Sequence, residues 1–372
     1  MTWKVAVLMG GSSFERDFSL ASGKYVSRTL EREGHTVLPL DTSTSLVDVL
    51  RAEKPDVAFI ALHGGHGEDG TVQSLLEYLA IPFVGSPSCV CRTTWNKSML
   101  PHIVAAYRNR MSAVTADATG TGAADATTTG ATGVNQTVAA EASPLAAPVE
   151  QTAAPAFWPR SVCLSATSFK DYGAAGALDL LSERIPSGYP LAVLPASGGS
   201  AMGINRVDDF DGLAPAILDA LSFDDEVLIE EWVNGVELAV SIIGTANEAK
   251  ALPPVEIHPH AGFFNTAVRL DPDLVDYYAP VRTASLSNNE AEAARIRTLI
   301  EEAALEVHRS FGCRDLSRVD LFWDGTRVKV LEINVSPGMA ETSLFPMASK
   351  AAAISFGTLL NALLDTALSR QE

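Results

Sequence analysis

Apolar runs alternate with helical spacing through the first 70 residues, and this order constrains the fold more than any other feature of the chain. Short β-rich runs occupy residues 4–9, 37–40 and 56–62, and helical patterns occupy residues 12–33 and 46–52 between them. Strands that alternate with helices are typical of a parallel sheet covered by helices, which binds ligands beyond the carboxyl ends of its strands. Glycine pairs follow the first and third runs, so we expect a ligand site at that edge.

A stretch without basic residues divides the chain. No Lys or Arg occurs in the 49 residues between Arg110 and Arg160, and no aromatic residue lies between Tyr107 and Phe157. A segment rich in Ala, Thr and Gly cannot bury enough apolar surface to offset the entropy of ordering it. We therefore predict a connecting helix over residues 97–110, followed by a disordered low-complexity insertion or a linker over residues 111–159.

Composition excludes several classes of protein. The 372 residues suffice for two or three domains, and 47% of them are hydrophobic. A net charge of −18 without any basic cluster argues against nucleic-acid binding. The four cysteines are too few for a disulfide framework and are expected as free thiols. Because no uncharged apolar run approaches the length of a membrane span, we expect a cytoplasmic protein without membrane insertion.

The strongest chemical signal lies near the C-terminal end, where polar and apolar residues alternate in two neighbouring runs. Arg318 and Asp320 share one face of the first predicted strand, and Glu332 and Asn334 share one face of the second. Two carboxylates and an amide that converge are oxygen ligands suited to Mg²⁺ bridging phosphates. The alternative is an edge hairpin whose polar face is merely solvated.

The register of that hairpin depends on its loop, which Asp324-Gly325 marks. A three-residue loop, 324–326, with a bulge at Gly325 or Thr326, keeps the polar residues on one face. It predicts that Asp320 pairs with Val330 and that Arg318 pairs with Glu332.

Three weaker signals lie elsewhere. The glycine-rich loop at 196–203 follows a predicted strand and could present backbone N–H groups to phosphates, although such loops are commonly plain turns. Ser12 and Glu15 have the spacing of a helix capping box. The segment 63–70 contains His, Glu and Asp without the helical spacing of a zinc site, so we expect a turn shaped around a ligand.

Five stretches, in order along the chain, together resemble the D-alanine–D-alanine ligase family of ATP-grasp enzymes. They are KVAVLMGGSSFERDFSLASG, ALHGGHGEDGTVQSLLEYLAIPFVGS, EVLIEEWVNGVELAV, SRVDLFW and VLEINVSPGMAETSLFPMA. The resemblance covers nearly the whole chain outside the insertion. It favours the metal-site interpretation of the C-terminal hairpin over the solvated one.

The resemblance implies an α/β fold, α+β in its ATP-grasp part, with an N-terminal parallel-sheet domain followed by a two-domain ATP-grasp fold. The implied divisions are an N-terminal substrate-binding domain at 1–96, a central domain at 160–235 and a C-terminal catalytic domain at 236–372. ATP lies between the last two. A homodimer is also implied, and by the resemblance alone.

The implied reaction joins two D-alanines into D-alanyl-D-alanine for peptidoglycan precursor synthesis. ATP phosphorylates the first D-alanine, and the amine of the second attacks the resulting acyl phosphate. Two Mg²⁺ ions, for which Mn²⁺ could substitute, neutralise the transferring phosphoryl group. The partners implied are therefore ATP and D-amino acids.

The resemblance also assigns roles to individual residues. The metal ligands it implies are Asp320, Glu332 and Asn334. The nucleotide-binding residues are Lys97, Gly199, Ser200, Glu230, Glu231, Trp232, Glu237 and Arg269. The substrate-binding residues are Glu15, His63, Glu68, Arg318, Gly338 and Ser343. The residues implied in catalysis are Glu15, Ser200, Arg318 and Ser343.

The chain departs from the family pattern in three places. Leu194 stands where the family has a phosphate-binding lysine, and Arg269-Leu270 stands where the D-alanine ligases have Lys-Tyr. The third departure is the insertion at 111–159. These differences leave two further hypotheses open: a related carboxylate-amine ligase with a different second substrate, and a catalytically silent relative that binds a nucleotide or a partner. The loss of the lysine predicts reduced activity for a D-alanine–D-alanine ligase, the related ligase predicts a different second substrate, and the silent relative predicts no ligation.

Overall fold

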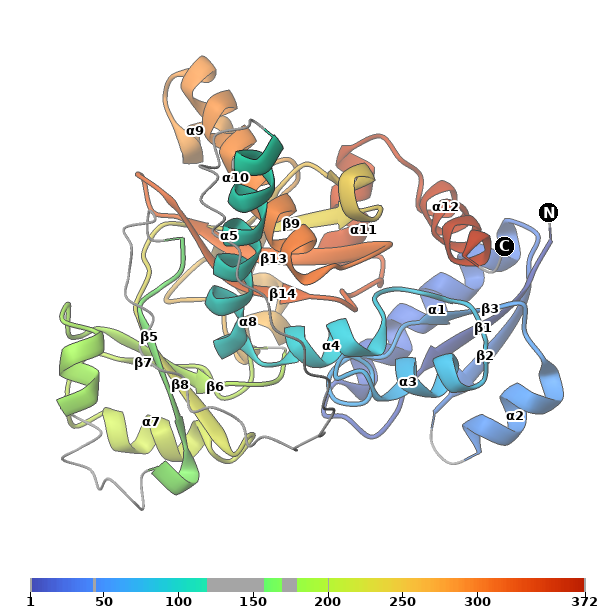
Figure 1. The fold of residues 1–372 in the computed structure, drawn as a ribbon, viewed down its shortest axis with the longest axis horizontal. Helices are drawn as coiled ribbons and strands as arrows, with labels where there is room; N and C mark the ends of the chain where they lie inside the picture. The colour runs from blue at the N-terminus through green and yellow to red at the C-terminus, as the bar shows by residue number, and fades with distance from the viewer. Residues whose placement is uncertain (1, 43–44, 119–156, 169–178, 200, 371–372) are drawn as a thin grey trace, which may run out of the picture.

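The computed structural model of the chain describes residues 2–42, 45–118, 157–168, 179–199 and 201–370. Three β-sheets organise them, with strands drawn from residues 4–84, 161–231 and 236–334. In Figure 1 the first sheet lies at the right, the second at the lower left and the third above and between them. The α/β class is confirmed, with a parallel N-terminal sheet and two antiparallel sheets.

The first sheet is parallel, with strand order β2-β1-β3-β4. Its strands are β1 (Lys4–Met9), β2 (Thr36–Asp41), β3 (Val57–Ile60) and β4 (Phe83–Val84). Its helices are α1 (Arg16–Arg32), α2 (Leu46–Glu53), α3 (Thr71–Tyr78) and α4 (Ser88–Trp95). Alternate residues of β1 pack into two different apolar clusters, one on each face of the sheet, which is why the whole strand is apolar. The predicted alternation of strands and helices is confirmed.

Helix α1 begins later than the capping-box pattern requires. Glu15 occupies the N-cap position, and its backbone N–H donates to Ser13 Oγ at 3.1 Å. The interpretation of Ser12 and Glu15 as a capping box is therefore wrong, because Ser12 lies in the turn before the helix. The Glu15 carboxylate is left at the carboxyl edge of the first sheet.

The second sheet is antiparallel, with strand order β5-β8-β6-β7. Its strands are β5 (Ser161–Ser165), β6 (Leu191–Pro195), β7 (Asn205–Val207) and β8 (Glu226–Glu231). Helix α7 (Leu213–Ala220) and helical residues 179–184 cover one face, against Val193 and Ile229. Leu194 and Leu228 therefore point to the opposite face.

The third sheet has strand order β12-β11-β9-β13-β14, with β10 paired to β9. Its strands are β9 (Val236–Ile243), β10 (Lys250–Ala251), β11 (Val255–Pro259), β12 (Val275–Tyr278), β13 (Leu316–Trp323) and β14 (Val328–Asn334). Helices α5 (Leu100–Ala118) and α10 (Glu290–Phe311) cover one face, where Val319 and Leu321 are completely buried. The alternate residues of β13, Arg318 and Asp320, consequently face the other way.

The remaining helices connect the three sheets. They are α8 (Thr266–Leu270), α9 (Thr283–Leu286), α11 (Leu344–Ala351) and α12 (Phe356–Ser369), with 3₁₀ turns at Lys97–Met99, Ala246–Glu248 and Pro272–Leu274. Helix α12 packs beside α1 and buries Leu360 and Leu364 in the cluster that covers the first sheet. The C-terminal end of the chain is thus anchored on the N-terminal sheet, as Figure 1 shows.

The loop of the β13–β14 hairpin is longer than predicted. Trp323 pairs with Val328, so four residues, 324–327, form the loop in place of the predicted three. The Asp324 carboxylate explains the length, because its Oδ1 accepts the backbone N–H groups of Thr326 and Arg327, each at 2.8 Å. Gly325 adopts a φ of +92°, but no bulge lies at this end of the hairpin.

The bulge lies instead in the middle of the same hairpin. The register shifts between Asp320 and Leu321, which places Glu332 opposite Asp320 and Asn334 opposite Arg318. The predicted pairs, Asp320 with Val330 and Arg318 with Glu332, are wrong. An extra residue, Leu331, compensates for the even loop, so the four polar side chains still share one face.

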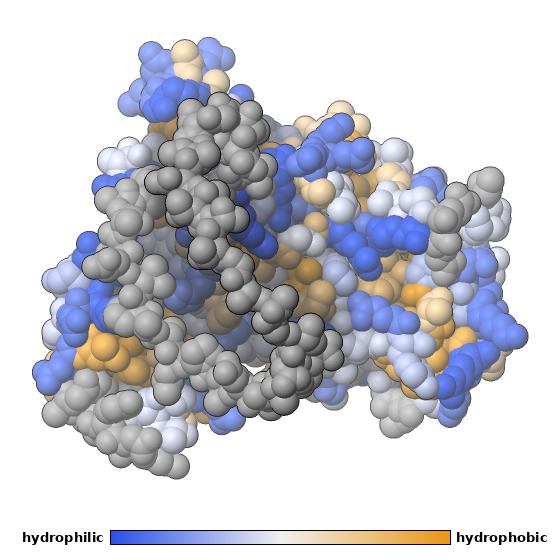
Figure 2. Space-filling view, viewed as in Figure 1, coloured by the Kyte–Doolittle hydropathy of each residue, from blue (hydrophilic) through white to orange (hydrophobic). Residues whose placement is uncertain are grey.

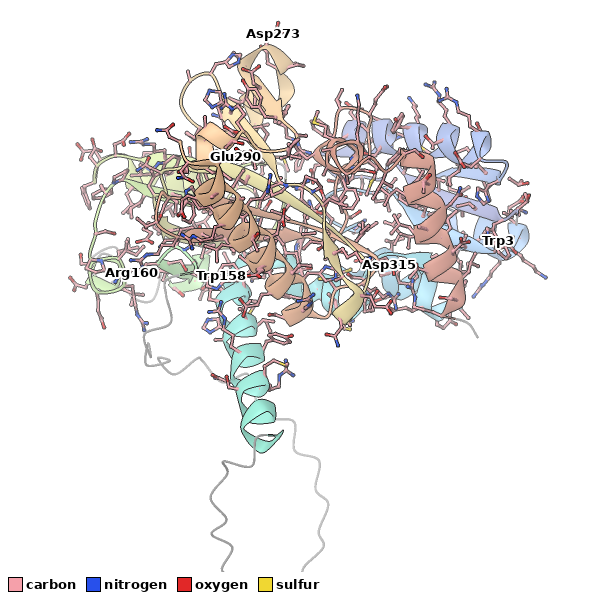
Figure 3. All side chains as sticks on the ribbon, turned by 90° about the horizontal axis from the view of Figure 1, so that it is seen from above. Trp3, Trp158, Arg160, Asp273, Glu290 and Asp315 are labelled. Atoms are coloured by element: carbon pink, nitrogen blue, oxygen red, sulfur yellow. The ribbon has the colours of Figure 1, made fainter. Side chains whose placement is uncertain are left out.

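The connecting helix extends beyond its predicted end. After the 3₁₀ turn, α5 continues to Ala118, eight residues past the predicted end at 110. Residues 157–159 also belong to the folded part, because the Phe157 carbonyl accepts the Val330 N–H at 2.8 Å and the Arg108 guanidinium lies 4.8 Å from the Phe157 ring. Figure 3 shows α5 projecting from the sheets. Residues 119–156 of the predicted insertion lie outside the described residues.

Within the described residues, no single helix is long and apolar enough to cross a membrane. Helices α11 and α12 reach the required length and composition together, but they meet at an angle of 104°. On the face in Figure 2, hydrophobic surface shows near the centre, while the corner formed by α9 and the start of α10 is mostly hydrophilic.

Candidate active site

A charged cluster occupies the open face of the β13–β14 hairpin. Arg318 binds Asp320 through two parallel hydrogen bonds, from Nε and Nη2, each 2.7 Å long. Glu332 lies directly opposite Asp320 in the register. The Asn334 Oδ1 accepts the Ser336 N–H at 2.9 Å, which fixes the orientation of the amide. The cluster combines two carboxylates, an amide and a guanidinium on one rigid surface.

Lys97 joins this hairpin to the glycine-rich loop. Its backbone N–H donates to the Ala196 carbonyl at 2.8 Å, and its ammonium donates to the Gly198 carbonyl. The Nζ atom also lies 3.3 Å from Glu332 Oε2, and only 11% of the side chain is exposed. A cation held in this way can be shared between the carboxylate and an anionic ligand at the loop.

A cavity with about 1170 Å³ of empty space, part of it open to solvent, separates the second and third sheets. It brings together most of the residues predicted to hold a nucleotide or a metal: Lys97, Gly199, Glu230, Glu231, Trp232, Glu237, Arg269, Asp320 and Glu332. Arg318, predicted for substrate binding and catalysis, lines it too, whereas Asn334 lines a neighbouring pocket with Lys97, Gly199 and Glu332. Ser200, which was also predicted, lies outside the described residues. The inner walls are apolar and include Met202, Phe264 and Phe322. Such a cavity, apolar with a polar and charged mouth, is typical of small-molecule sites.

Two glutamates in the cavity have raised pKa values. Burial raises the pKa of Glu230 to about 8, against the opposing effect of Lys97. Burial also raises the pKa of Glu237 to about 8, and the nearby charges of Asp320 and Glu332 act in the same direction. A protonated carboxyl group can donate a hydrogen bond as well as accept one. The neighbouring Glu231 forms an ion pair, with its Oε1 2.7 Å from Lys329 Nζ.

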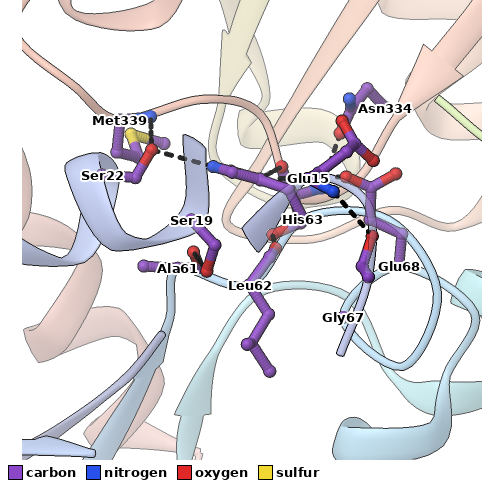
Figure 4. A network of polar contacts seen from close by, with 12 residues as sticks. Glu15, Ser19, Ser22, Ala61, Leu62, His63, Gly67, Glu68, Asn334 and Met339 are labelled. Carbon is purple, nitrogen blue, oxygen red and sulfur yellow. Dashed lines mark hydrogen bonds and ion pairs between the residues drawn. The ribbon is translucent and has the colours of Figure 1, made fainter. Parts of the chain in front are cut away.

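A second cluster lies where the first sheet meets the hairpin (Figure 4). Glu15 is 3% exposed, and Arg269 Nη1 approaches its Oε1 at 3.6 Å. The other oxygen, Oε2, is buried without a hydrogen-bond partner among the described residues. Burial raises the Glu15 pKa, and the Arg269 charge opposes the rise. A side chain at Gly64, where φ is +73°, would collide with this carboxylate at 2.6 Å, so glycine is required there.

His63 is held as a neutral ring in the same cluster. Its Nδ1 lies 3.0 Å from the Ser336 carbonyl and must donate to it, which leaves Nε2 to accept from Ser22 Oγ at 2.8 Å. Burial lowers the His63 pKa to about 4. Glu68 lies 3.9 Å from the His63 ring, and burial raises its pKa well above the usual range, with Glu15 adding to the effect. The cluster holds two carboxyl groups beside the Arg269 guanidinium, and the Glu15 oxygen without a partner is available to a further cation.

Gly338 and Ser343 lie in the loop that leads from β14 into α11. The Ser343 Oγ accepts the Ala340 N–H at 3.1 Å, and a side chain at Gly338 would come within 2.9 Å of that hydroxyl. The next residue, Leu344, lines the cavity. This loop also reaches the first sheet, because the Met339 N–H donates to Ser22 Oγ at 3.1 Å.

Sequence comparison places these features in a known family. A family profile described as "D-ala D-ala ligase C-terminus" matches residues 180–365, and one described as "D-ala D-ala ligase N-terminus" matches residues 47–86. The D-alanine–D-alanine ligase of Anaeromyxobacter sp. (strain K) is 32% identical over 371 residues, which span 98% of each chain. The chain belongs to the D-alanine–D-alanine ligase family. The corresponding enzyme of Pelotomaculum thermopropionicum is 31% identical, over 99% of this chain and 98% of its own.

Solved structures of D-alanine–D-alanine ligases agree with this membership. The Bacillus anthracis D-alanine–D-alanine ligase complexed with ATP superposes with a TM-score of 0.69 at 25% identity, covering 99% of this chain and 98% of that one. The VanG D-Ala:D-Ser ligase of Enterococcus faecalis shares the fold, with a TM-score of 0.71 at 22% identity and coverage of 99% and 100%. The ATP-grasp fold expected from the sequence is confirmed, and membership of the D-alanine–D-alanine ligase family indicates a ligase.

The structure describes the surroundings of one of the two residues that depart from the D-alanine–D-alanine ligase pattern, Leu194, but not those of Leu270. Leu194 is 7% exposed and lines the cavity beside the glycine-rich loop, packed with Ala196 and Leu228. The position at which the resemblance implies a lysine therefore holds a hydrocarbon at the cavity wall. The side chain of Leu270 lies outside the described residues.

Sequence reasoning missed the apolar walls of the cavity. Phe322 lies two residues after Asp320 on the same strand face, so the alternation that identified the charged residues could have found it. Met202 and Phe264 come from loops, where no periodicity marks which side chains turn inward.

Proposed function

We propose that the protein is an ATP-dependent ligase that joins two D-alanines through an acyl phosphate, giving D-alanyl-D-alanine for peptidoglycan precursor synthesis. The observation that carries the proposal is the cation-and-carboxylate cluster at the mouth of the cavity, formed by Arg318, Asp320, Glu332 and Lys97. Phosphoryl transfer is catalysed mainly by positioning and by electrostatic stabilisation, and this cluster has the residues for both. The names of the most similar relatives supply the substrate.

The cavity is the proposed ATP site. The apolar walls beside Phe322 and Met202 suit a purine ring, and the protonated carboxyls of Glu230 and Glu237 suit its polar edge and the ribose hydroxyls. The phosphates then extend toward the glycine-rich loop and Lys97. This orientation brings the terminal phosphate to the hairpin cluster.

The hairpin also suits a divalent metal. Asp320, Glu332 and Asn334 provide oxygen ligands on one face, and Mg²⁺ usually takes one or two carboxylates together with phosphates and waters. Phosphate oxygens of a bound nucleotide and waters would complete the coordination of a metal held by these three residues. Two Mg²⁺ ions, or Mn²⁺ in their place, would neutralise charge on the transferring phosphoryl group.

The first D-alanine is proposed to bind between the two clusters. The Glu15 oxygen without a partner accepts a hydrogen bond from the ammonium group of this D-alanine. The Arg318 guanidinium faces the carboxylate of the same D-alanine. One carboxylate oxygen then attacks the γ-phosphorus, and ADP leaves. The amine of the second D-alanine attacks the acyl carbon, phosphate leaves and the amine loses a proton. Ser343 is proposed to contact the carboxylate of the second D-alanine.

The identity of the second substrate is the least constrained part of the proposal. Leu270 supplies no hydroxyl group, which favours a related ligase with a different acceptor as the second candidate function. An acceptor screen distinguishes the two, in which D-alanine competes with other D-amino acids and with D-lactate. A clear preference for D-alanine supports the main proposal, whereas preferential use of another acceptor overturns this part of it.

Leu194→Lys is expected to lower the KM for ATP about tenfold and to raise kcat. The leucine lines the cavity beside the glycine-rich loop, so a lysine there adds a cation where the phosphates are proposed to lie. A charge-assisted hydrogen bond contributes about 1.5–3 kcal/mol, which corresponds to roughly tenfold or more. Steady-state ADP release at varied ATP measures the effect.

The matched control is Ala192→Lys. Ala192 lines the same cavity two residues earlier on β6, so this variant adds the same charge farther from the loop. It is expected to give no improvement in the KM for ATP. If the KM for ATP is no lower in Leu194→Lys than in Ala192→Lys, the proposed position of the ATP phosphates is wrong.

A further inference from the structure

We propose that Thr266 is a positioning residue that ties α8 to the glycine-rich loop; the inference rests on the proposed function. The Thr266 Oγ1 donates to the Ala201 carbonyl at 3.0 Å, across 65 residues of sequence. Thr266 is the first residue of α8, and Ala201 lies between the cavity-lining residues Gly199 and Met202. This hydrogen bond links the second sheet to the third across the ATP cavity.

Helix α8 is well fixed on its own sheet, so the hydrogen bond has a rigid base. The Asn265 side chain caps the helix by accepting the Val268 N–H at 3.0 Å. Val268 is 7% exposed and packs with Ile257 and Val275 of the third sheet. A hydroxyl group on a fixed helix restrains the carbonyl to which it donates a hydrogen bond. A hydroxyl group on a mobile loop would move together with that carbonyl.

The spacing of α8 lets it contact two other parts of the molecule together. Thr266 and Arg269 are three residues apart, so both side chains lie on the same side of the helix. Arg269 reaches Glu15 at 3.6 Å and lies 4.4 Å from the centre of the Phe18 ring, both in the N-terminal part of the chain. Thr266 reaches the glycine-rich loop. Loss of the Thr266 contact is therefore expected to affect the position of Arg269 as well.

The partner of Thr266 is a strained residue. Ala201 has a φ of +55°, in the left-handed region that a residue with a side chain seldom adopts. Strain of this kind persists only where surrounding contacts maintain it. The hydrogen bond from Thr266 is one such contact, because it holds the carbonyl of that residue in a fixed direction. Without it, we expect the loop to relax and to present its N–H groups less well to the phosphates.

The test compares Thr266→Val, which removes the hydroxyl at constant shape, with Thr266→Ser, which keeps it. We expect Thr266→Val to lower kcat about fivefold, since a hydrogen bond of this kind contributes about 1 kcal/mol. Thr266→Ser is expected to stay within twofold of the parent. Thr298→Val is the matched control, because it removes an equivalent hydroxyl-to-carbonyl hydrogen bond on the exposed surface of α10. It should leave kcat unchanged.

Hydrogen exchange supplies a readout that does not depend on ligation. With ADP and Mg²⁺ bound, the amides of residues 201–203 and 266–269 should lose protection in Thr266→Val and keep it in Thr266→Ser. Equal protection in Thr266→Val and the parent overturns the inference, as does a Thr266→Ser variant that behaves like Thr266→Val. If the parent shows no D-alanine-dependent turnover, the proposed function fails, while the exchange result still decides the role of Thr266 as a link between α8 and the loop.

Discussion

Replacing Arg318 by methionine lowers kcat by about two to three orders of magnitude, the usual effect of removing a preorganised donor from a developing charge. The Arg318 side chain is 16% exposed and donates two 2.7 Å hydrogen bonds to Asp320, so it needs no reorganisation when charge develops on the transferring phosphoryl group. Arg318→Lys keeps the charge but loses the planar pair of donors, and we expect a smaller decrease. Initial rates of ADP release at saturating ATP and D-alanine measure both variants.

Lys329→Met is the control for Arg318→Met. Lys329 is also a cation paired with a carboxylate near the cavity, at 2.7 Å from Glu231, but its polar contacts are with Glu231 and the Trp158 carbonyl. Its loss should change kcat by no more than a few fold. An Arg318→Met enzyme that retains more than a third of the parent kcat would show that the hairpin cluster is not the reaction centre.

Asp315→Ala lowers the free energy of unfolding by about 3–5 kcal/mol, the range measured when one partner of a buried ion pair is removed. Asp315 is completely buried at the start of β13. Its carboxylate accepts hydrogen bonds from Arg370 at 2.5 and 2.8 Å and from the Gly85 N–H at 2.8 Å. The carboxylate therefore joins the C-terminal end of the chain, the third sheet and the end of β4, and its loss leaves a guanidinium without its partner.

Urea unfolding measures this effect, with Glu292→Ala as the control. Glu292 pairs with Arg295 on the exposed surface of α10, and such a pair contributes at most about 0.5 kcal/mol. The Asp315→Ala/Arg370→Ala double variant should recover part of the lost stability, because both charges are then absent. A decrease below 1 kcal/mol for Asp315→Ala would mean that the ion pair does not hold these three elements together.

Local patterns were sufficient to predict the first sheet. The run at 4–9 became β1 because its residues are apolar on both faces, which fits only a strand with helices on either side. The start of α1 was not predictable in the same way. The spacing of Ser12 and Glu15 satisfies a capping box, but the carboxylate is drawn instead toward Arg269, which lies 254 residues later in the chain.

The hairpin shows how a correct conclusion can follow from an incorrect register. The alternation of Arg318, Asp320, Glu332 and Asn334 predicted one shared face, and the structure has that face. The predicted loop length and the predicted bulge at Gly325 or Thr326 were both wrong, and the observed bulge at Leu331 offsets the longer loop. Alternation of polar and apolar residues predicts which side chains share a face of the strand more reliably than it predicts which residues pair across the two strands. A one-residue slip that moves apolar side chains off the buried face costs stability, whereas a change of loop length combined with a bulge keeps them buried.

Contacts between distant segments were beyond any local pattern. The pairing of Lys97 with Glu332, the position of Arg269 at Glu15 and the hydrogen bond from Thr266 to Ala201 each depend on how the sheets meet. The raised pKa values of Glu230 and Glu237 have the same origin, since burial in the cavity causes both. Amino-acid composition does not indicate which carboxyl groups are buried.

Isotope transfer tests the proposed reaction most directly. The protein is incubated with ATP, Mg²⁺ and D-alanine whose carboxylate carries ¹⁸O, and the products are analysed by mass spectrometry. Ligation through an acyl phosphate predicts D-alanyl-D-alanine, together with inorganic phosphate that contains one ¹⁸O atom from the first D-alanine. ADP and dipeptide formed with unlabelled phosphate would contradict the acyl-phosphate route, and the absence of any D-alanine-dependent product would contradict the ligase proposal itself.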